Sequence, residues 1–131
     1  MPTAKGPFQV KRAPIPPAFD ATGLARHSLD KSYNGDLEGT SLGEMVSAVG
    51  SVQGSAGYVA MERVTGTLHG RAGTFVLQHS ATMNRGTPSL VLTVVPDTGT
   101  DGLEGLAGLM RIVIENGEHH YEFDYTVGTD G

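Results

Sequence analysis

The stretch GYVAMERVTGTLHGRAGTFVLQH, residues 57–79, decides the fold expected for this chain. Apolar and polar residues alternate on both sides of His69-Gly70, which predicts two strands joined by a tight turn at that dipeptide. A turn at this place sets the register of the whole hairpin. The opposing pairs are then Leu68 with Arg71, Val64 with Phe75, and Ala60 with His79.

One face of this hairpin is mostly apolar, and we expect it to look inward. Its apolar members are Tyr58, Val64, Leu68, Phe75 and Leu77. Glu62 and His79 lie on the same face as diagonal neighbours, within reach of each other's side chains. Because an acid and an imidazole in a barrel interior can transfer a proton or hold a polar group, these two are the candidate catalytic residues.

The composition is typical of an all-β protein with many turns. The chain has 131 residues, of which 19 are glycine and 7 are proline, and 38% are hydrophobic. This length fits one domain, residues 1–131, with a flexible start at 1–6. Antiparallel strands joined by short turns close most economically into a barrel, since closure removes exposed edges. We therefore predict a single antiparallel eight-stranded barrel with almost no helix.

Charge and cysteine content exclude several classes of partner. The chain has 9 basic and 14 acidic residues, a net charge of −5, and its basic residues are scattered, which argues against a nucleic-acid partner. It has no cysteine, so it has no disulfide and no thiolate metal site. The first twenty residues lack the apolar run of a signal peptide, and no stretch reaches membrane-spanning length. We expect a soluble, cytoplasmic domain without a membrane partner.

The first strands are predicted from their turn residues. A short strand at residues 7–12 is followed by a proline-rich segment, and a strand at 24–33 leads into Asn34-Gly35, the dipeptide best suited to a tight hairpin. A two-residue loop places Lys31 opposite Glu38, a charge pair that suits an outer, solvated face. In the third strand, at 36–49, the two glycines predict a bulge or a sharp bend.

The second half of the chain continues this pattern. Residues 80–88 read as a polar loop, and residues 89–95 read as a strand that is apolar on both faces. A strand of that kind needs a cover outside the barrel, and a partner subunit is the simplest one, so we expect a homodimer or higher oligomer. Between this strand and the last hairpin, one short helical turn should direct Leu103 and Leu106 to the core.

The last hairpin turns at Asn116-Gly117. This turn places Ile112 opposite Tyr121 and Met110 opposite Phe123. The inner face is the alternating series Tyr121, Phe123, Tyr125 and Val127. Of the two adjacent histidines, His119 should point inward and His120 outward.

Two motifs have simpler interpretations. Residues 39–43 match the G-x-S-x-G nucleophile pattern, but that chemistry needs a strand-turn-helix in an α/β sheet, which this chain lacks. A metal site would have to combine Glu62, His79 and His119 from different strands, and none of the local spacings that mark metal sites is present. We therefore expect neither a metal nor a cofactor.

Two sequence blocks indicate a family. G-Y-V-x-x-E-R-V-x-G at 57–66 and G-R-x-G-x-F-V-L-Q-H at 70–79, with His120-Tyr121 and Asp124-Tyr125, resemble a bacterial family labelled domain of unknown function 3224. The resemblance runs from about Phe8 to Val127. It implies a wider similarity to allene oxide cyclase-like, dirigent-like and lipocalin-like barrels, whose interiors take small apolar molecules. The label carries no activity, so Glu62 and His79 match it as positions rather than as known catalysts.

Three functions remain open at this point. The first is binding of a small apolar or amphipathic ligand inside the barrel, with Glu62 and His79 fixing its polar group. The second is a cofactor-independent cyclase or isomerase in which the same pair moves a proton, so whether the protein is an enzyme stays undecided. The third is an oligomeric structural protein with a filled barrel, in which Glu62 pairs with Arg63 or Arg71. The predicted ligand-binding residues are Tyr58, Glu62, Phe75, Leu77, His79, His119, Tyr121 and Phe123.

Overall fold

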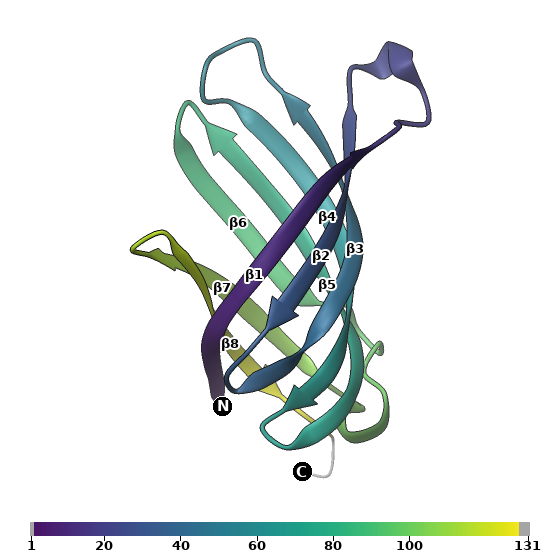
Figure 1. Ribbon diagram of the computed structural model, residues 1–131, viewed down its shortest axis with the longest axis vertical. Coiled ribbons are helices and arrows are strands. Elements are labelled where there is room, and N and C mark those ends of the chain that lie inside the picture. The colour runs from purple at the N-terminus through teal and green to yellow at the C-terminus, as the bar shows by residue number, and fades with distance from the viewer. Residues whose placement is uncertain (1, 129–131) are drawn as a thin grey trace.

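The computed structural model describes residues 2–128, which form one closed antiparallel barrel (Figure 1). Each strand pairs with the next in the chain, and β8 pairs with β1. This confirms the predicted eight-stranded barrel. The strands are β1 (Thr3–Ile15), β2 (Ala25–Tyr33), β3 (Leu37–Val49), β4 (Ala56–Leu68), β5 (Arg71–Asn84), β6 (Thr87–Val94), β7 (Ala107–Glu115) and β8 (Glu118–Thr126).

Two short 3-10 helices lie in the connections, η1 (Asp20–Thr22) and η2 (Asp101–Leu103). The turn formed by η2 directs Leu103 and Leu106 into the core, where both are buried as predicted. Neither helix within residues 2–128 is long and apolar enough to cross a membrane.

Two-residue turns set the register of two of the three predicted hairpins. At His69-Gly70 the φ angles are 45° and 81°, and at Asn116-Gly117 they are 51° and 80°. Positive φ at both central positions defines the type I′ turn, whose twist matches that of the flanking strands. The predicted registers are confirmed, including Val64 opposite Phe75 and Ile112 opposite Tyr121.

A third turn of the same kind corrects the loop predicted at residues 80–88. Arg85 and Gly86 have φ angles of 49° and 92°, and β5 continues to Asn84 before this turn. Residues 80–84 of β5 pair with β6 and, as far as Met83, with β4. Polar side chains on the outer face of a strand gave this segment the composition of a loop.

The connection between β2 and β3 differs from the prediction. Only Gly35 of the Asn34-Gly35 dipeptide has a positive φ, at 94°, so the turn is not type I′. The Asn34 N–H donates to the Pro7 carbonyl at 3.1 Å, which ties the loop to β1. The register shifts as a result, and Lys31 lies opposite Ser41 instead of Glu38. Lys31 is therefore inside the barrel, not on the outer face.

The third strand bends without a bulge. Its pairing with β4 is continuous from Leu37 to Val49. At Gly43 an added Cβ would lie 2.2 Å from the Met61 carbonyl oxygen and 2.9 Å from the Glu62 Cβ. The glycine thus allows the close approach of β4. The prediction offered a bulge or a sharp bend in this strand, and the continuous pairing excludes the bulge.

The first strand is longer than predicted at both ends. Residues 3–6, expected to be a flexible start, pair with β8, so the strand begins at Thr3. Beyond Phe8, β1 pairs with β2 alone and continues to Ile15 past Pro14. Proline is tolerated there because that side of the strand has no partner in the sheet.

The barrel has two halves of different construction. The packed half is the end where the β7–β8 hairpin closes the sheet, where β1 begins and β8 ends (Figure 1). Its core includes Leu37, Leu68, Phe75 and Phe123, all fully buried. The Phe75 and Phe123 rings stack with centroids 6.0 Å apart.

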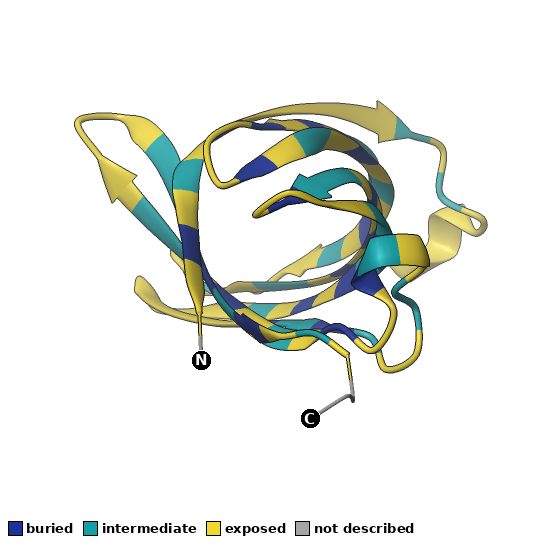
Figure 2. Ribbon diagram, turned by 90° about the horizontal axis from the view of Figure 1, so that it is seen from below, coloured by how far each residue is buried: buried dark blue, intermediate teal, exposed yellow. Residues whose placement is uncertain are grey.

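The hollow half is the opposite end, near η1. There β8 no longer pairs with β1 beyond Phe8, and β6 pairs with β7 only at Thr93, among the residues described. The buried apolar cluster in this half is Leu29, Met45 and Ala60, with Tyr58 packed against it. Buried and exposed residues alternate along the strands where the interior is filled, as in β4 and β8 (Figure 2), because successive side chains of a strand point to opposite faces. In the hollow half, residues 9–14 of β1 and 87–91 of β6 are exposed throughout.

No part of residues 2–128 covers the outer face of β6. Leu92 and Val94 face the core, whereas Val91 is 54% exposed on the outer side. Among the described residues the strand is therefore buried on its inner face alone, and the homo-oligomer stays a prediction.

Candidate functional site

The boundary between the two halves is a buried polar layer built around Glu62. Glu62 on β4 and His79 on β5 are 1% and 3% exposed. The register of the β4–β5 hairpin makes them diagonal neighbours, and the His79 Nε2 lies 2.5 Å from the Glu62 Oε2. The predicted meeting of these two side chains is confirmed.

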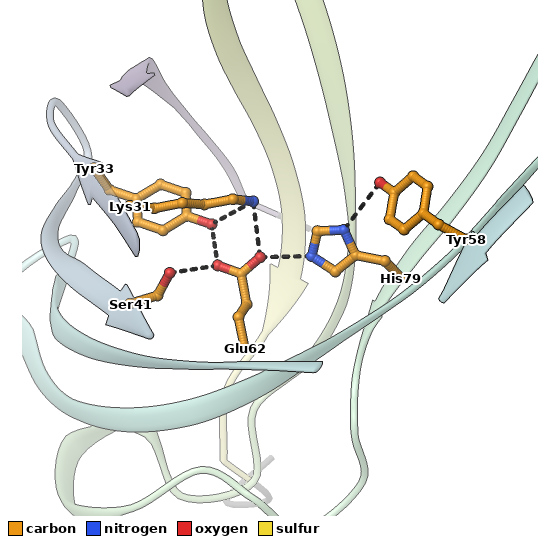
Figure 3. Close-up of polar contacts among 6 residues, drawn as sticks. All are labelled: Lys31, Tyr33, Ser41, Tyr58, Glu62 and His79. Carbon is orange, nitrogen blue, oxygen red and sulfur yellow. Dashed lines mark hydrogen bonds and ion pairs between the residues drawn. The ribbon is translucent and has the colours of Figure 1, made fainter. Parts of the chain in front are cut away.

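Four side chains donate to the Glu62 carboxylate (Figure 3). Besides His79, the Lys31 Nζ lies 2.8 Å from Oε2. The Tyr33 hydroxyl donates to Oε1 at 2.6 Å, and the Ser41 hydroxyl donates to the same oxygen at 2.7 Å. A carboxylate has about four lone-pair sites, so this one is fully occupied by the protein.

The partners of Glu62 keep it ionised. Burial alone would raise the pKa of Glu62, but the hydrogen bond from His79 and the charge and hydrogen bond of Lys31 lower it from 4.5 to about 2. The same burial, and then the negative charge of Glu62, raises the pKa of Tyr33 well above its usual range. The layer therefore holds an ion pair of Lys31 and Glu62 at neutral pH.

Sequence reasoning assigned the wrong cation to Glu62. Lys31 is its partner, whereas Arg63 lies on the outer face of β4 and is exposed. The sequence of β2 already indicated that Lys31 faces inward. Leu29 and Tyr33 lie two residues to either side of it, on the same face of the strand, and are apolar or aromatic. Lys31 is 5% exposed, and its ammonium lies 5.1 Å from the centre of the Phe8 ring.

Ser41 is a structural member of this layer. It lies in the middle of β3, is 1% exposed and donates to Glu62. A nucleophile elbow requires a sharp turn that exposes the serine, and a continuous strand does not provide one. The G-x-S-x-G match here follows from glycines that admit the neighbouring strand.

The second nitrogen of His79 faces Tyr58. The ionised carboxylate of Glu62 can only accept a hydrogen bond, so the Nε2 of His79 carries a proton and donates it to Glu62. The Tyr58 hydroxyl lies 3.4 Å from Nδ1 (Figure 3). Glutamate, histidine and tyrosine thus form a series that leads from the buried layer toward the hollow half.

A cavity of about 440 Å³ lies in the hollow half, on the far side of the polar layer from the packed core. Its apolar wall consists of Phe8, Val10, Leu29, Met45, Leu90, Ile112 and Ile114. Its polar lining consists of Arg12, Lys31, Tyr58, His79 and His119. Ile114 is 65% exposed, so the cavity opens to solvent beside the β7–β8 hairpin.

A second hollow extends this cavity toward the end of the barrel. It has a volume of about 390 Å³ and shares Arg12, Met45, Tyr58 and Leu90 with the first. The interior of the hollow half is therefore continuous from its rim to the polar layer. Pockets of this size are typical of sites for small molecules.

The predicted site residues separate into three groups. Tyr58, His79 and His119 line the cavity. Glu62 lies beneath the lining, with its side chain fully buried. The remaining four belong to the packed core: Phe75, Leu77, Tyr121 and Phe123.

Tyr121 has a structural task in the packed half. Its hydroxyl donates to the Asn34 carbonyl at 2.7 Å and accepts from the Leu37 N–H at 2.7 Å. Burial raises the pKa of Tyr121 to about 12, with smaller contributions from nearby acidic groups. This hydroxyl, together with β1, holds the β2–β3 loop whose geometry brings Lys31 inside.

Of the polar residues that line the cavity, sequence reasoning missed two, Lys31 and Arg12. Phe8, Val10 and Arg12 are alternate residues of β1 and so lie on one face of the strand, and all three line the cavity. The short strand predicted at residues 7–12 contained this signal. The face of this strand could not be assigned from the sequence, because the proline-rich segment that follows it indicated no partner strand.

Within the described part of the chain, no three His, Asp or Glu residues are grouped so that they could hold a metal ion.

Comparison with known proteins identifies the family. The family model described as "Protein of unknown function (DUF3224)" matches residues 4–125. A crystal structure of a protein with unknown function from the DUF3224 family of Shewanella oneidensis MR-1 shares 48% identity. The alignment covers 98% of each chain, with a TM-score of 0.94. A search of curated proteins finds no match. The chain therefore belongs to the DUF3224 family.

Proposed function

We propose that the hollow half of the barrel binds a small amphipathic molecule, with its apolar part against the apolar wall and its polar part on the polar residues that line the cavity. The observation that supports this function is the cavity of about 440 Å³, which is apolar on its sides and polar at its base. A ligand there would cover apolar surface that is now open to water, and each Å² covered stabilises the complex by roughly 25 cal/mol.

The polar layer gives this site a rigid base. Glu62 is fully engaged by four donors, so it positions Lys31 and His79 rather than contacting the ligand itself. This role differs from the one expected from the sequence, in which Glu62 itself would bind the polar group of the ligand. Side chains held by such a network present their remaining polar atoms in one orientation, which favours selective binding.

Native mass spectrometry of the protein as purified, without refolding, tests this proposal. We expect an extra mass on each barrel, and we expect its occupancy to fall in Met45→Trp, because Met45 lines both hollows. Met61→Trp is the matched control, since Met61 is 50% exposed on the outer face of β4. Titration of both variants with 1-octanol by calorimetry provides the second measurement.

The outcomes separate clearly. Loss of bound mass and of octanol binding in Met45→Trp alone supports the cavity as the site. Equal behaviour of the two variants, or an unmodified wild-type protein that also fails to bind octanol, would contradict the proposal. In that event the third function, a structural barrel, would be favoured.

Proton transfer by His79 is a second candidate function, favoured by the Glu62–His79–Tyr58 series. With Nε2 donating to Glu62, the Nδ1 of His79 faces the Tyr58 hydroxyl and the cavity. A base oriented by a buried carboxylate is the arrangement that general acid–base catalysis requires. A cofactor-independent isomerase or cyclase reaction is consistent with it.

Substitution at His79 distinguishes the two functions once a ligand is known from mass spectrometry. For an enzyme, His79→Gln should abolish conversion of that ligand while its affinity changes little. For a binding protein, no conversion occurs in the wild type, and the variant changes affinity alone. Tyr58→Phe provides the corresponding test for the hydroxyl.

A further inference from the structure

The charged residues that line the cavity, Arg12 and Lys31, are basic, whereas the molecule as a whole has an excess of acidic residues. The chain carries 14 acidic and 9 basic residues. Yet within residues 2–128 no Asp or Glu lines either hollow, whereas Arg12, Lys31, His79 and His119 line the larger one. A cavity with low-dielectric walls and one sign of charge concentrates ligands of the opposite sign.

The charges beneath the cavity cancel, and Arg12 remains. The ammonium of Lys31 is neutralised by Glu62 at 2.8 Å. Arg12 makes no ion pair with any residue of the described chain. Its guanidinium is therefore the uncompensated charge at the cavity.

Arg12 and Tyr58 converge where the two hollows meet. Both residues line both hollows. Burial, followed by the charge of Glu62, raises the pKa of Tyr58, and the positive charge of Arg12 opposes this rise. A guanidinium fork and a hydroxyl at one position provide donors suited to a planar anionic group.

We propose that the ligand of this barrel is an amphipathic anion, in its simplest form a carboxylate, whose head group is bound by Arg12 with the Tyr58 hydroxyl. Its apolar chain lies along the wall formed by Leu29, Met45 and Leu90. This inference rests on the proposed binding function and adds the charge of the ligand and the residue that selects it.

Calorimetric titration with three probes of equal chain length tests the inference: octanoate, 1-octanol and octylamine. At neutral pH and low salt, octanoate should bind about tenfold or more tighter than octanol, because a hydrogen bond to a charged group contributes more than a neutral one. Octylamine should bind weakest. In Arg12→Gln the preference for octanoate over octanol should disappear, with a loss of octanoate affinity of roughly ten- to hundredfold.

Arg63→Gln is the matched control, since it removes the same charge from the outer face of β4 and should leave all three affinities unchanged. Arg12→Lys, which keeps the charge and loses the fork, should give an intermediate affinity for octanoate. Thermal denaturation of each variant verifies that it is folded.

Failure of the inference differs from failure of the binding function. Equal binding of octanoate and octanol by the wild type, or a preference that survives in Arg12→Gln, would overturn the role of Arg12 and leave the cavity as a site. A wild type that binds none of the three probes would overturn both.

Discussion

The packed and hollow halves of this barrel are built on the same eight strands, yet one is filled by its own side chains and the other is not. In the packed half, aromatic and leucine side chains from opposite strands meet across the interior, as in the Phe75–Phe123 stack. In the hollow half, the buried apolar residues are Leu29, Met45 and Ala60. A barrel of eight strands is close to the size at which side chains just fill the interior. A few smaller side chains, together with the loss of β1–β8 pairing beyond Phe8, therefore suffice to open a cavity.

The polar layer around Glu62 lies between the packed half and the hollow half and contacts both. On one side it contacts the packed core through Tyr33, which lies edge-on to Tyr121 with ring centroids 5.7 Å apart. On the other side it presents Lys31 and His79 to the cavity. The comparison suggests that stability resides mainly in the packed half and the layer, and that the hollow half is available for function. Each of the following predictions tests that division.

The largest effect is expected at the layer itself. Glu62→Gln keeps the shape of the side chain but leaves the Lys31 ammonium buried without a counter-charge. We expect the free energy of unfolding, measured with urea, to fall by about 3–5 kcal/mol. The double variant Lys31→Met/Glu62→Gln removes both charges and should recover part of that loss. A double variant whose loss equals the sum of the two single losses would show that the pair is not coupled.

The second-largest effect is a loss of folding stability at low pH, where Glu62 becomes protonated. The pKa of Glu62 is about 2 in the folded protein and about 4.5 when unperturbed. A group whose pKa is lowered by folding stabilises the protein above its unfolded pKa, and this contribution is lost as the pH falls from about 4.5 to about 2. The amount is about 3 kcal/mol.

Urea midpoints of the wild type and of the Lys31→Met/Glu62→Gln variant across this pH window isolate that contribution, because all other carboxylates are common to both proteins. The wild type should lose stability more steeply as the pH falls. Parallel curves would contradict the assignment of the low pKa to Glu62.

Matched leucine truncations compare the two halves directly. Leu68 is fully buried in the packed core, whereas Leu29 is 5% exposed and lines the cavity. Leu68→Ala creates a new void and should cost about 3–4 kcal/mol, whereas Leu29→Ala enlarges an existing cavity and should cost about 1–2 kcal/mol. Equal losses in urea denaturation would mean that the hollow half contributes as much to stability as the packed half.

The smallest effect concerns the turns at the two ends of the barrel. Arg85, in a type I′ turn at the hollow end, has a φ of 49°. Asparagine tolerates this conformation better, so Arg85→Asn should stabilise the protein by about 0.5 kcal/mol and raise the Tm by roughly 2 °C. His69 has a φ of 45° in the equivalent turn at the packed end, but its ring also hydrogen-bonds to Tyr125.

His69→Asn loses that contact and should therefore lower the Tm. A gain at both turns would show that the contact of His69 with Tyr125 contributes little to stability. A gain at neither would show that the positive φ is not a significant source of strain.

Much of the fold was predictable because it depends on local signals. Type I′ turns have a narrow sequence preference, and each one sets the register of two long strands. The alternation of apolar residues then predicts which face is buried, and Glu62 beside His79 follows from the β4–β5 register alone. The errors occurred where tertiary contacts override local preference. Residues 80–84 are polar but pair on both sides, and residues 3–6 are ordered by β8, which is remote in sequence.

The candidate site likewise has features that the local sequence predicts and features that depend on tertiary contacts. By itself the sequence determined the barrel, two hairpin registers and the pairing of Glu62 with His79, because these depend on residues close together in the chain. The alternation of Lys31 with Leu29 and Tyr33 indicates that Lys31 faces inward, but only the tertiary structure decided that its ammonium reaches Glu62 and that Arg12 lines the cavity. The register of β2 against β3 depends on a loop held by Pro7 and Tyr121, which lie at opposite ends of the chain. Contacts of that kind have no local pattern, because they exist only once the barrel has closed.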